Sequence, residues 1–141
     1  MTESLPGSRS LDWIPTGRGA PSIDAVVWVD VVALDAAWCL RDRIGPGGTG
    51  PAKGGAYAGF GVWLRRGQPV EMAEVCFDGT RVTFTNGRHR FAWLRDHRVE
   101  TLPVQIDPDR APGLHALCGS EHRRSELRLH RPPPAPPVKS G

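Results

Sequence analysis

The sequence lacks the features that would place it in a membrane, a secretory pathway or a cysteine-stapled scaffold. It has no apolar run of about 18 residues, so we expect no transmembrane helix and no membrane partner. Its first residues carry neither a basic start nor an apolar stretch, so we expect a cytoplasmic protein without a secretory signal. Its three cysteines are widely spaced and match no metal-ligand pattern, so we expect free, buried thiols and no resident metal.

A strong excess of one charge is also missing. The net charge of +3, from 18 basic and 15 acidic residues, does not by itself indicate a nucleic-acid partner. The length of 141 residues suits one domain. Glycine and proline, in contrast, are plentiful, and their concentration at 45–61 and 131–137 predicts a loop and an extended tail. The basic run at 121–131 indicates a solvated surface, with contact to a polyanion as the alternative.

The rest of the chain alternates strand and helix patterns, which predicts a small α+β domain with a mixed sheet and helices packed on it. Alternating or β-branched apolar residues indicate strands, whereas apolar residues three or four apart indicate helices. We expect a flexible N-terminal segment at 1–22, the domain at 23–118 and a basic, proline-rich disordered tail at 119–141. The expected elements are strands at 25–29, 68–77, 81–85 and 99–106, helices at 32–41, 57–66 and 88–97, and a helical turn at 114–117.

The junction between the strand at 81–85 and the helix that follows is the strongest candidate for chemistry. Asn86 and Gly87 break the strand, and Arg88, His89 and Arg90 then fall in the first helical turn. Cations at that position oppose the positive end of the helix dipole, and a bound phosphate would relieve the conflict. Arginine suits phosphate because its planar fork donates two hydrogen bonds. The alternative is pairing with nearby acids, of which the sequence offers Glu71, Glu74 and Asp96.

Two further segments offer contributors to such a site. The glycine-rich stretch at 45–55 departs from the P-loop pattern, because Lys53 is followed by glycine where Ser or Thr is required. It indicates a mobile surface loop, or a lid to which Thr49 and Lys53 would contribute. Glu71 and Glu74 have an odd separation on one predicted strand, so at most one faces a given site unless a bulge intervenes. That carboxylate would activate water or a metal, and a solvated or arginine-paired carboxylate is the alternative.

The chain resembles the fold shared by the ParB N-terminal domain and sulfiredoxin. The residues that carry the resemblance are Gln68-Pro69-Val70-Glu71-Met72, Asn86 to Leu94 and Val99 to Val104, within a matching stretch at 25–106. Gly87 and Arg90 match the Gly-x-x-Arg helix start of ParB-like proteins. In sulfiredoxin the same stretch reads Gly-Cys-His-Arg and binds ATP phosphates. Arg88 occupies the place of the reactive cysteine here, which excludes a sulfinic-acid reductase.

Within that superfamily, Thr83 to Arg90 and Ile44 to Gly50 resemble the plasmid fertility inhibition factors. The resemblance implies a protein that blocks conjugative or related DNA transfer and binds a nucleotide or DNA. Some superfamily members hydrolyse nucleoside triphosphates or cleave DNA, which implies ATP and Mg²⁺ as cofactors. The implied site has phosphate contacts from Arg88 and Arg90, a turn oriented by Asn86 and Gly87, and catalytic roles for Glu71 and His89.

Two other functions stay open at this point. One is a non-enzymatic inhibitor that binds a protein of a DNA-transfer apparatus, with the catalytic-looking residues as relics. The other is a small regulatory or toxin-neutralising domain on a mobile element. Hydrolysis of ATP or cleavage of DNA would distinguish an enzyme from both.

Overall fold

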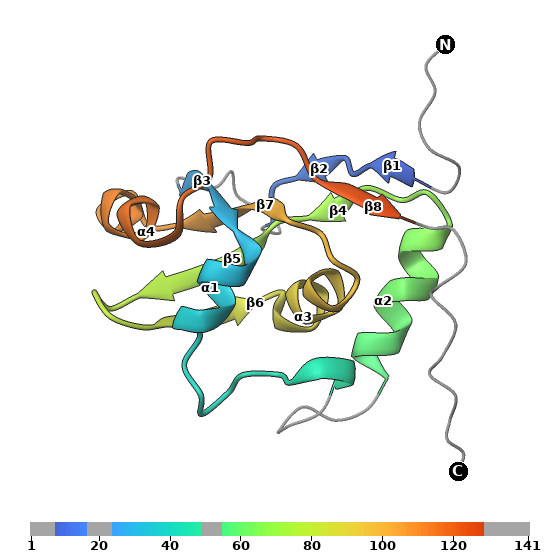
Figure 1. Cartoon of the computed structure of the whole chain (residues 1–141), viewed down its shortest axis with the longest axis horizontal. Coiled ribbons are helices and arrows are strands. Elements are labelled where there is room, and N and C mark those ends of the chain that lie inside the picture. The colour runs from blue at the N-terminus through green and yellow to red at the C-terminus, as the bar shows by residue number, and fades with distance from the viewer. Residues whose placement is uncertain (1–7, 17–23, 49–54, 129–141) are drawn as a thin grey trace.

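A computed structural model describes residues 8–16, 24–48 and 55–128 of the chain (Figure 1). Its main sheet has four strands in the order β3-β7-β5-β6. The central strand β7 is antiparallel to β3 and parallel to β5, and β5 is antiparallel to β6. The predicted mixed sheet and α+β class are therefore confirmed. The strands are β3 (Ala25–Asp30), β5 (Ala73–Phe77), β6 (Val82–Asn86) and β7 (Thr101–Ile106).

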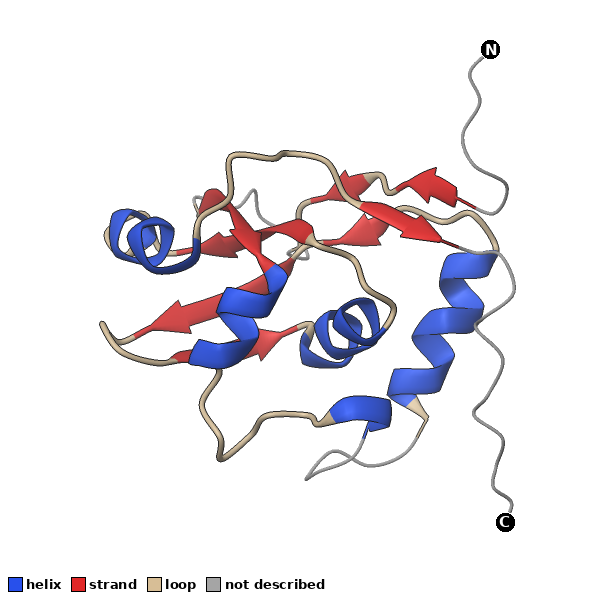
Figure 2. Cartoon of the chain, in the orientation of Figure 1, coloured by secondary structure: helices blue, strands red, loops and turns tan. Residues whose placement is uncertain are grey.

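Helices pack around the sheet. They are α1 (Val31–Ala37), the 3-10 turn η1 (Pro46–Gly48), α2 (Ala56–Arg65), α3 (Arg88–Asp96) and α4 (Ala111–Cys118). Figure 2 shows α4 at one end of the molecule and α2 at the other, with α3 beside α2. In the described ranges, no helix is long and apolar enough to cross a bilayer.

Helix α3 is packed on two sides, and this determines where its first turn lies. Phe91 meets the ring of Trp38 edge-on in the sheet core, at a centroid distance of 5.5 Å. Trp93 meets Phe60 of α2 in the same way, also at 5.5 Å. Aromatic pairs at this distance and tilt are favourable beyond the area that they bury. Helix α3 is therefore held against both Trp38 in the core and α2.

Short strands from both ends of the described chain lie beside the main sheet. β1 (Ser8–Ser10) pairs with β8 (Glu126–Arg128), and β2 (Trp13–Ile14) pairs in parallel with β4 (Val70–Glu71). Leu11 and Leu127 are buried, so residues 8–16 and 126–128 belong to the packed domain. The predicted flexible segment and disordered tail are wrong for these residues, because single leucines in polar stretches reach the core. Residues 1–7, 17–22 and 129–141 lie outside the described residues.

Two predicted elements differ from the structure. The helix predicted at 32–41 ends at Ala37, because Trp38 takes up an extended backbone and places its indole in the core. Val32 and Leu40 are consequently 75% and 78% exposed, not part of an inward stripe. The strand predicted at 68–77 breaks at Met72, since β4 pairs with β2 whereas β5 joins the main sheet.

The cysteine prediction is correct only in part. All three thiols are free, and burial raises the pKa of Cys118 to about 11. Cys39 is half-buried, whereas Cys76 is exposed on β5. Cys76 occupies an outward position of the alternating strand, between buried Val75 and buried Phe77.

Candidate functional site

The predicted strand–glycine–helix junction is present, and its geometry requires glycine. Gly87 caps α3 in the left-handed region, at φ 88° and ψ 10°. A Cβ on Gly87 would lie 2.8 Å from the Cα and Cβ of Ala73 and 2.8 Å from Nη2 of Arg90. The missing side chain therefore makes room for β5 and for a guanidinium, in addition to permitting the turn.

Arg90 spans this junction without an ion pair. Its Nε donates to the carbonyl of Glu71 at 3.1 Å, and Nη2 donates to the carbonyl of Met72 at 3.4 Å and to Oδ1 of Asn86 at 3.3 Å. Burial lowers the pKa of Arg90, and the nearby charge of Glu71 opposes that shift. The Arg90 charge is thus held by neutral oxygens, which leaves it able to attract an anion.

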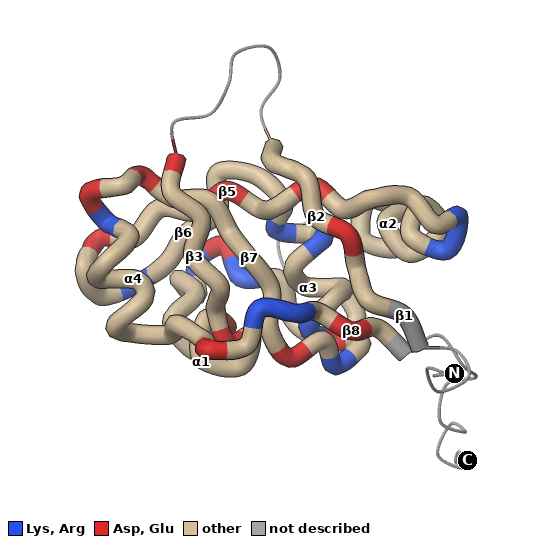
Figure 3. The backbone as a smooth tube through the Cα atoms, turned by 90° about the horizontal axis from the view of Figure 1, so that it is seen from above, with Lys and Arg blue, Asp and Glu red and all other residues tan. Residues whose placement is uncertain are grey.

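The acids offered as alternative partners do not neutralise the arginines of the first turn. Glu74 accepts a hydrogen bond from Nδ2 of Asn86 at 2.9 Å, and Asp96 pairs with Arg95 at the other end of α3. Among the described residues, neither Arg88 nor Arg90 forms an ion pair. Figure 3 shows basic positions at the start of α3 and again at the end of α2.

His89 adds a buried polar atom that lacks a partner. Its Nε2 is buried and has no hydrogen bond among the described residues. Burial lowers the pKa of His89, and the neighbouring charge of Arg88 lowers it further. The imidazole is therefore neutral near pH 7, when one ring nitrogen donates and the other accepts. An unpaired buried nitrogen costs stability, and a ligand that bonds to it would recover that cost.

A cavity of about 660 Å³ opens in front of this junction. Its size is typical of pockets for small molecules and cofactors. Its polar lining, here called the polar side, comes from Gln68, Glu71, Gly87, His89 and Arg90. Its mostly apolar lining, here called the apolar side, comes from Ile14, Ala56, Phe60, Trp63 and Pro69, and Ile14 lies opposite Glu71 in the β2–β4 pair. Four of the predicted site residues, Glu71, Gly87, His89 and Arg90, therefore share one cavity.

The remaining predicted site residues lie elsewhere. Asn86 stands behind the cavity, where it links Glu74 to Arg90, and Arg88 is not part of the cavity lining. Thr49 and Lys53 fall outside the described residues, so the predicted lid is untested. Glu74 is not part of the cavity lining, whereas Glu71 is, and the two carboxylates lie on different strands, β5 and β4, so alternation along one strand does not apply to them.

Mg²⁺ fits this site only when the ligand supplies most of the oxygens. Glu71 is the one carboxylate among the lining residues. In the described part of the chain, no group of three or more His, Cys, Asp or Glu side chains is placed to hold a metal. Mg²⁺ is commonly held by one or two carboxylates together with substrate phosphates. The lining therefore fits a metal that arrives with a phosphate ligand.

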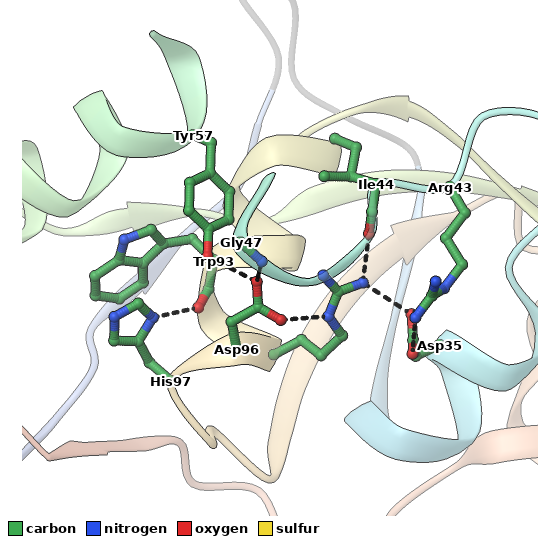
Figure 4. Close-up of polar contacts among 9 residues, drawn as sticks. Asp35, Arg43, Ile44, Gly47, Tyr57, Trp93, Asp96 and His97 are labelled. Atoms are coloured by element: carbon green, nitrogen blue, oxygen red, sulfur yellow. Dashed lines mark hydrogen bonds and ion pairs between the residues drawn. The ribbon is translucent and has the colours of Figure 1, made fainter. Parts of the chain in front are cut away.

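A second polar cluster, which sequence reasoning missed, fixes the opposite end of α3 (Figure 4). Arg95 bridges Asp35, at 3.1 Å, and Asp96, at 2.9 Å. Asp96 also accepts hydrogen bonds from the hydroxyl of Tyr57 at 2.7 Å and from the amide of Gly47 at 2.9 Å. Burial alone would raise the pKa of Asp96, but these three hydrogen bonds together lower it. Through Tyr57, the cluster anchors the first turn of α2 to α3.

Sequence reasoning also missed the apolar side of the cavity. Trp63 belongs to the helix predicted at 57–66, but the sequence did not indicate that it is 45% exposed at the cavity. Ile14 belongs to a segment that was predicted to be flexible and is 40% exposed at the same cavity. The aromatic residues of α2 were the only sequence feature that pointed to this apolar lining. The pairing of β2 with β4 joins distant residues, so no local sequence pattern indicates it.

Comparisons with known proteins identify one similar solved structure and one matching family. No curated protein matches the chain. One solved structure, of the Oncogenic Suppression Activity Protein, a plasmid fertility inhibition factor, as a gold(I) cyanide derivative, is similar with a TM-score of 0.55 and 24% identity. The similarity covers 75% of this chain and 61% of that chain, and at this identity it shows the fold alone. Residues 65–119, which run from the end of α2 through α4, match the Plasmid Fertility inhibition factor family, which confirms the resemblance to that family stated from the sequence.

Proposed function

We propose that the cavity at the start of α3 binds the phosphate group of a nucleotide or of DNA, and that the protein thereby interferes with conjugative DNA transfer. The observation that carries this proposal is the shared lining by Gly87, His89 and Arg90, with no ion pair on Arg90 among the described residues. The match to the fertility inhibition family supports the biological setting.

The first turn of α3 supplies three kinds of donor to a phosphate. Its leading amides have no partner within the helix and carry a partial positive charge. Arg90 adds a fixed guanidinium, and His89 adds the unpartnered Nε2. A phosphate placed here would satisfy donors that the fold leaves open, which is the basis of anion binding at helix starts.

Glu71 sets the condition under which a phosphate can enter. Its carboxylate lines the same cavity and would repel an anion. A divalent cation brought by the ligand would bridge the two, since one carboxylate with phosphate oxygens is a usual Mg²⁺ set. In a hydrolytic reaction, Glu71 would orient the attacking water and His89 would pass a proton. We therefore expect binding to require Mg²⁺ more strongly in the wild type than in Glu71→Gln.

The test of phosphate binding compares arginines of equal charge at different places. We expect Arg90→Ala to weaken binding of ATP and of a short DNA oligonucleotide by roughly 10- to 100-fold, the scale of lost charged hydrogen bonds. Arg81→Ala, on the exposed turn between β5 and β6, removes the same charge away from the cavity and should change little. Binding of DNA should also weaken steeply with salt.

Because Arg90 also bonds to backbone carbonyls, the fold of each variant is checked by its melting temperature. Arg90→Lys keeps the charge but loses the forked geometry, so an intermediate affinity is expected. Unchanged affinity in a folded Arg90→Ala protein would remove this site from consideration.

A second function, non-enzymatic inhibition by binding a protein of the transfer apparatus, is favoured by one observation. The cavity holds a single carboxylate, which is few for a metal-dependent hydrolase. Phosphate release from ATP and nicking of plasmid DNA, each with Mg²⁺ or Mn²⁺, distinguish the two. Absence of both activities, together with a tight complex with a transfer protein, would favour inhibition by protein contact.

A further inference from the structure

The two sides of the cavity differ in chemistry in a way that phosphate binding does not use. His89 and Arg90 belong to α3, whereas Trp63 and Phe60 belong to α2. A free phosphate or a duplex backbone would occupy only the polar side. The volume and the mixed lining of the cavity instead suit a molecule that joins an anionic group to a flat apolar ring.

Trp63 is placed as a rigid, accessible surface within this cavity. Trp63 is 45% exposed and lines the cavity, so its ring is accessible to a ligand there. Its Nε1 donates to the carbonyl of Pro69 at 3.4 Å, which ties one edge of the ring to the chain leading into β4. The indole of Trp63 is therefore restrained while much of its surface stays open to a ligand.

The helix that carries Trp63 is itself held closely against α3. A Cβ on Gly61 would lie 2.8 Å from Nε1 of Trp93, so glycine permits the close contact between the helices. Phe60 packs edge-on against the same Trp93 ring, and Tyr57 is bonded to Asp96. Three successive contacts thus fix the position of Trp63 relative to the Gly87 turn.

We propose that Trp63 is a stacking platform for an unpaired nucleobase whose phosphate lies at Gly87, His89 and Arg90. The inference rests on the proposed phosphate site and extends it to the class of ligand: a nucleotide, either free or within single-stranded nucleic acid. Stacking on an aromatic ring tolerates every base because each has a π face. In a duplex the bases are stacked on one another and are not accessible to Trp63.

Gln68 is the neighbour most suited to contact the edge of that base. It lines the cavity next to Pro69, and its amide can both donate and accept hydrogen bonds. We assign it a supporting position, since stacking and not edge recognition carries the proposal.

The experiment separates the base from the phosphate by the choice of probe. Binding of the full chain is measured for inorganic tripolyphosphate, for ATP, for a fluorescent single-stranded 12-nucleotide oligomer and for the same oligomer as a duplex, all with Mg²⁺. The variants are Trp63→Ala, Trp63→Phe and, as a matched control, Val62→Ala. Val62 is exposed on the same helix but does not line the cavity. Melting temperatures show whether each variant is folded.

We expect the single strand to bind more tightly than the duplex, and ATP more tightly than tripolyphosphate. Trp63→Ala should weaken ATP and the single strand by about 5- to 150-fold, as for the loss of one stacked base, and leave tripolyphosphate binding unchanged. Trp63→Phe should restore most of the affinity, and Val62→Ala should match the wild type. A larger loss for ATP than for the oligomer would identify the free nucleotide as the ligand, and the reverse would identify the single strand.

Two results overturn the inference while keeping the phosphate site. One is a folded Trp63→Ala protein that binds ATP and the single strand like the wild type. The other is a duplex that binds as tightly as the single strand. Failure of tripolyphosphate and all the other probes to bind would instead reject the phosphate site itself. Capture of a protein whose binding depends on Trp63, with no effect on any nucleotide probe, would reassign this face to a protein partner.

Discussion

Each end of α3 carries an arginine, but the two arginines differ in their partners. At the C-terminal end, Arg95 is shared between the carboxylates of Asp35 and Asp96 and is only 9% exposed. At the N-terminal end, Arg90 bonds to backbone and amide oxygens and has no ion pair. One arginine is part of the scaffold, and the other keeps its charge available.

The difference teaches where a ligand can add stability. Cations at the C-terminal end are favourable to the helix dipole and are neutralised internally as well. Cations at the N-terminal end oppose the dipole, and burial lowers the pKa of Arg90, although the nearby charge of Glu71 opposes that shift. An anion bound at the N-terminal end would remove both penalties. This asymmetry, and not the number of arginines, supports the proposed site.

The largest effect on stability is expected at the C-terminal end of α3, here called the scaffold end because Arg95 is neutralised there; the N-terminal end, where a phosphate would bind, is called the binding end. Arg95→Ala leaves Asp96 without a cation and leaves Asp35 with Arg43 alone, so we expect the free energy of unfolding to fall by about 2–4 kcal/mol. Chemical denaturation measures this change. Arg88→Ala, which removes an arginine without an ion pair, should change stability by less than about 0.5 kcal/mol. Equal losses in the two variants would contradict the division of roles.

The next effect concerns the turn at the binding end. Gly87→Ala forces a left-handed backbone and a 2.8 Å approach to Ala73, so we expect a loss of about 2–4 kcal/mol in a denaturation experiment. Gly79→Ala is the matched control, because Gly79 also has a positive φ of 100° but has no atom within 4 Å of its Cβ position. The difference between the two variants isolates the packing against β5. Similar losses of unfolding free energy in the two variants would show that the positive φ alone, and not the contact with Ala73, requires glycine at position 87.

A smaller effect is expected where the scaffold end meets α2. Tyr57→Phe removes the hydroxyl that donates to Asp96 at 2.7 Å, and we expect a loss of about 1–2 kcal/mol in unfolding free energy. The same change should also loosen the start of α2, seen as faster amide hydrogen exchange over residues 56–60. Exchange that is unchanged there would show that Gly61 and Phe60 suffice to hold α2.

The smallest effect is the change of protein stability with pH that His89, at the N-terminal end of α3, causes. The pKa of His89 in the folded protein is lower than its ordinary value of 6.5, so the unfolded chain binds its proton first as pH falls. The stability contribution is therefore complete above about 6.5 and is lost as pH falls through the folded pKa. We expect His89→Gln to flatten this slope in denaturation curves from pH 7.5 to pH 5. An unchanged slope in His89→Gln would show that another group causes the pH dependence.

Ligand binding should reverse that dependence. A bound phosphate favours the charged imidazole, so ATP affinity should rise as pH falls through the pKa of His89. The rise should be absent in His89→Gln, as measured by calorimetry across the same pH range. A flat affinity profile in the wild type would place His89 outside contact with the phosphate.

The polar side of the candidate site could be predicted because its signals are local. Asn86-Gly87 followed by a basic triplet indicates both the end of a strand and an unusual helix start within five residues. The bonds of Arg90 to the carbonyls of Glu71 and Met72 could not be predicted, since they depend on how β4 and β5 approach the helix.

The apolar side and the scaffold cluster depend on contacts between distant residues. Trp63 faces the cavity because Gly61 meets Trp93, and Asp35 pairs with a residue 60 positions later. Periodicity places such residues on an element but does not give their partners. For the same reason the fold class was predicted correctly, whereas the strands at residues 8–16 and 126–128 were not.

The pairing of β8 with β1 has a consequence for how the chain acquires its structure. Ser10 aligns with Glu126, so this ladder joins segments separated by more than a hundred residues. It cannot form on the ribosome until almost all of the described chain has emerged. Contacts of such long range slow folding, because a large loop must close before they contribute. Until then the hydrophobic surface that Leu127 covers stays open to solvent, so the newly made protein depends on its last strand for protection from aggregation.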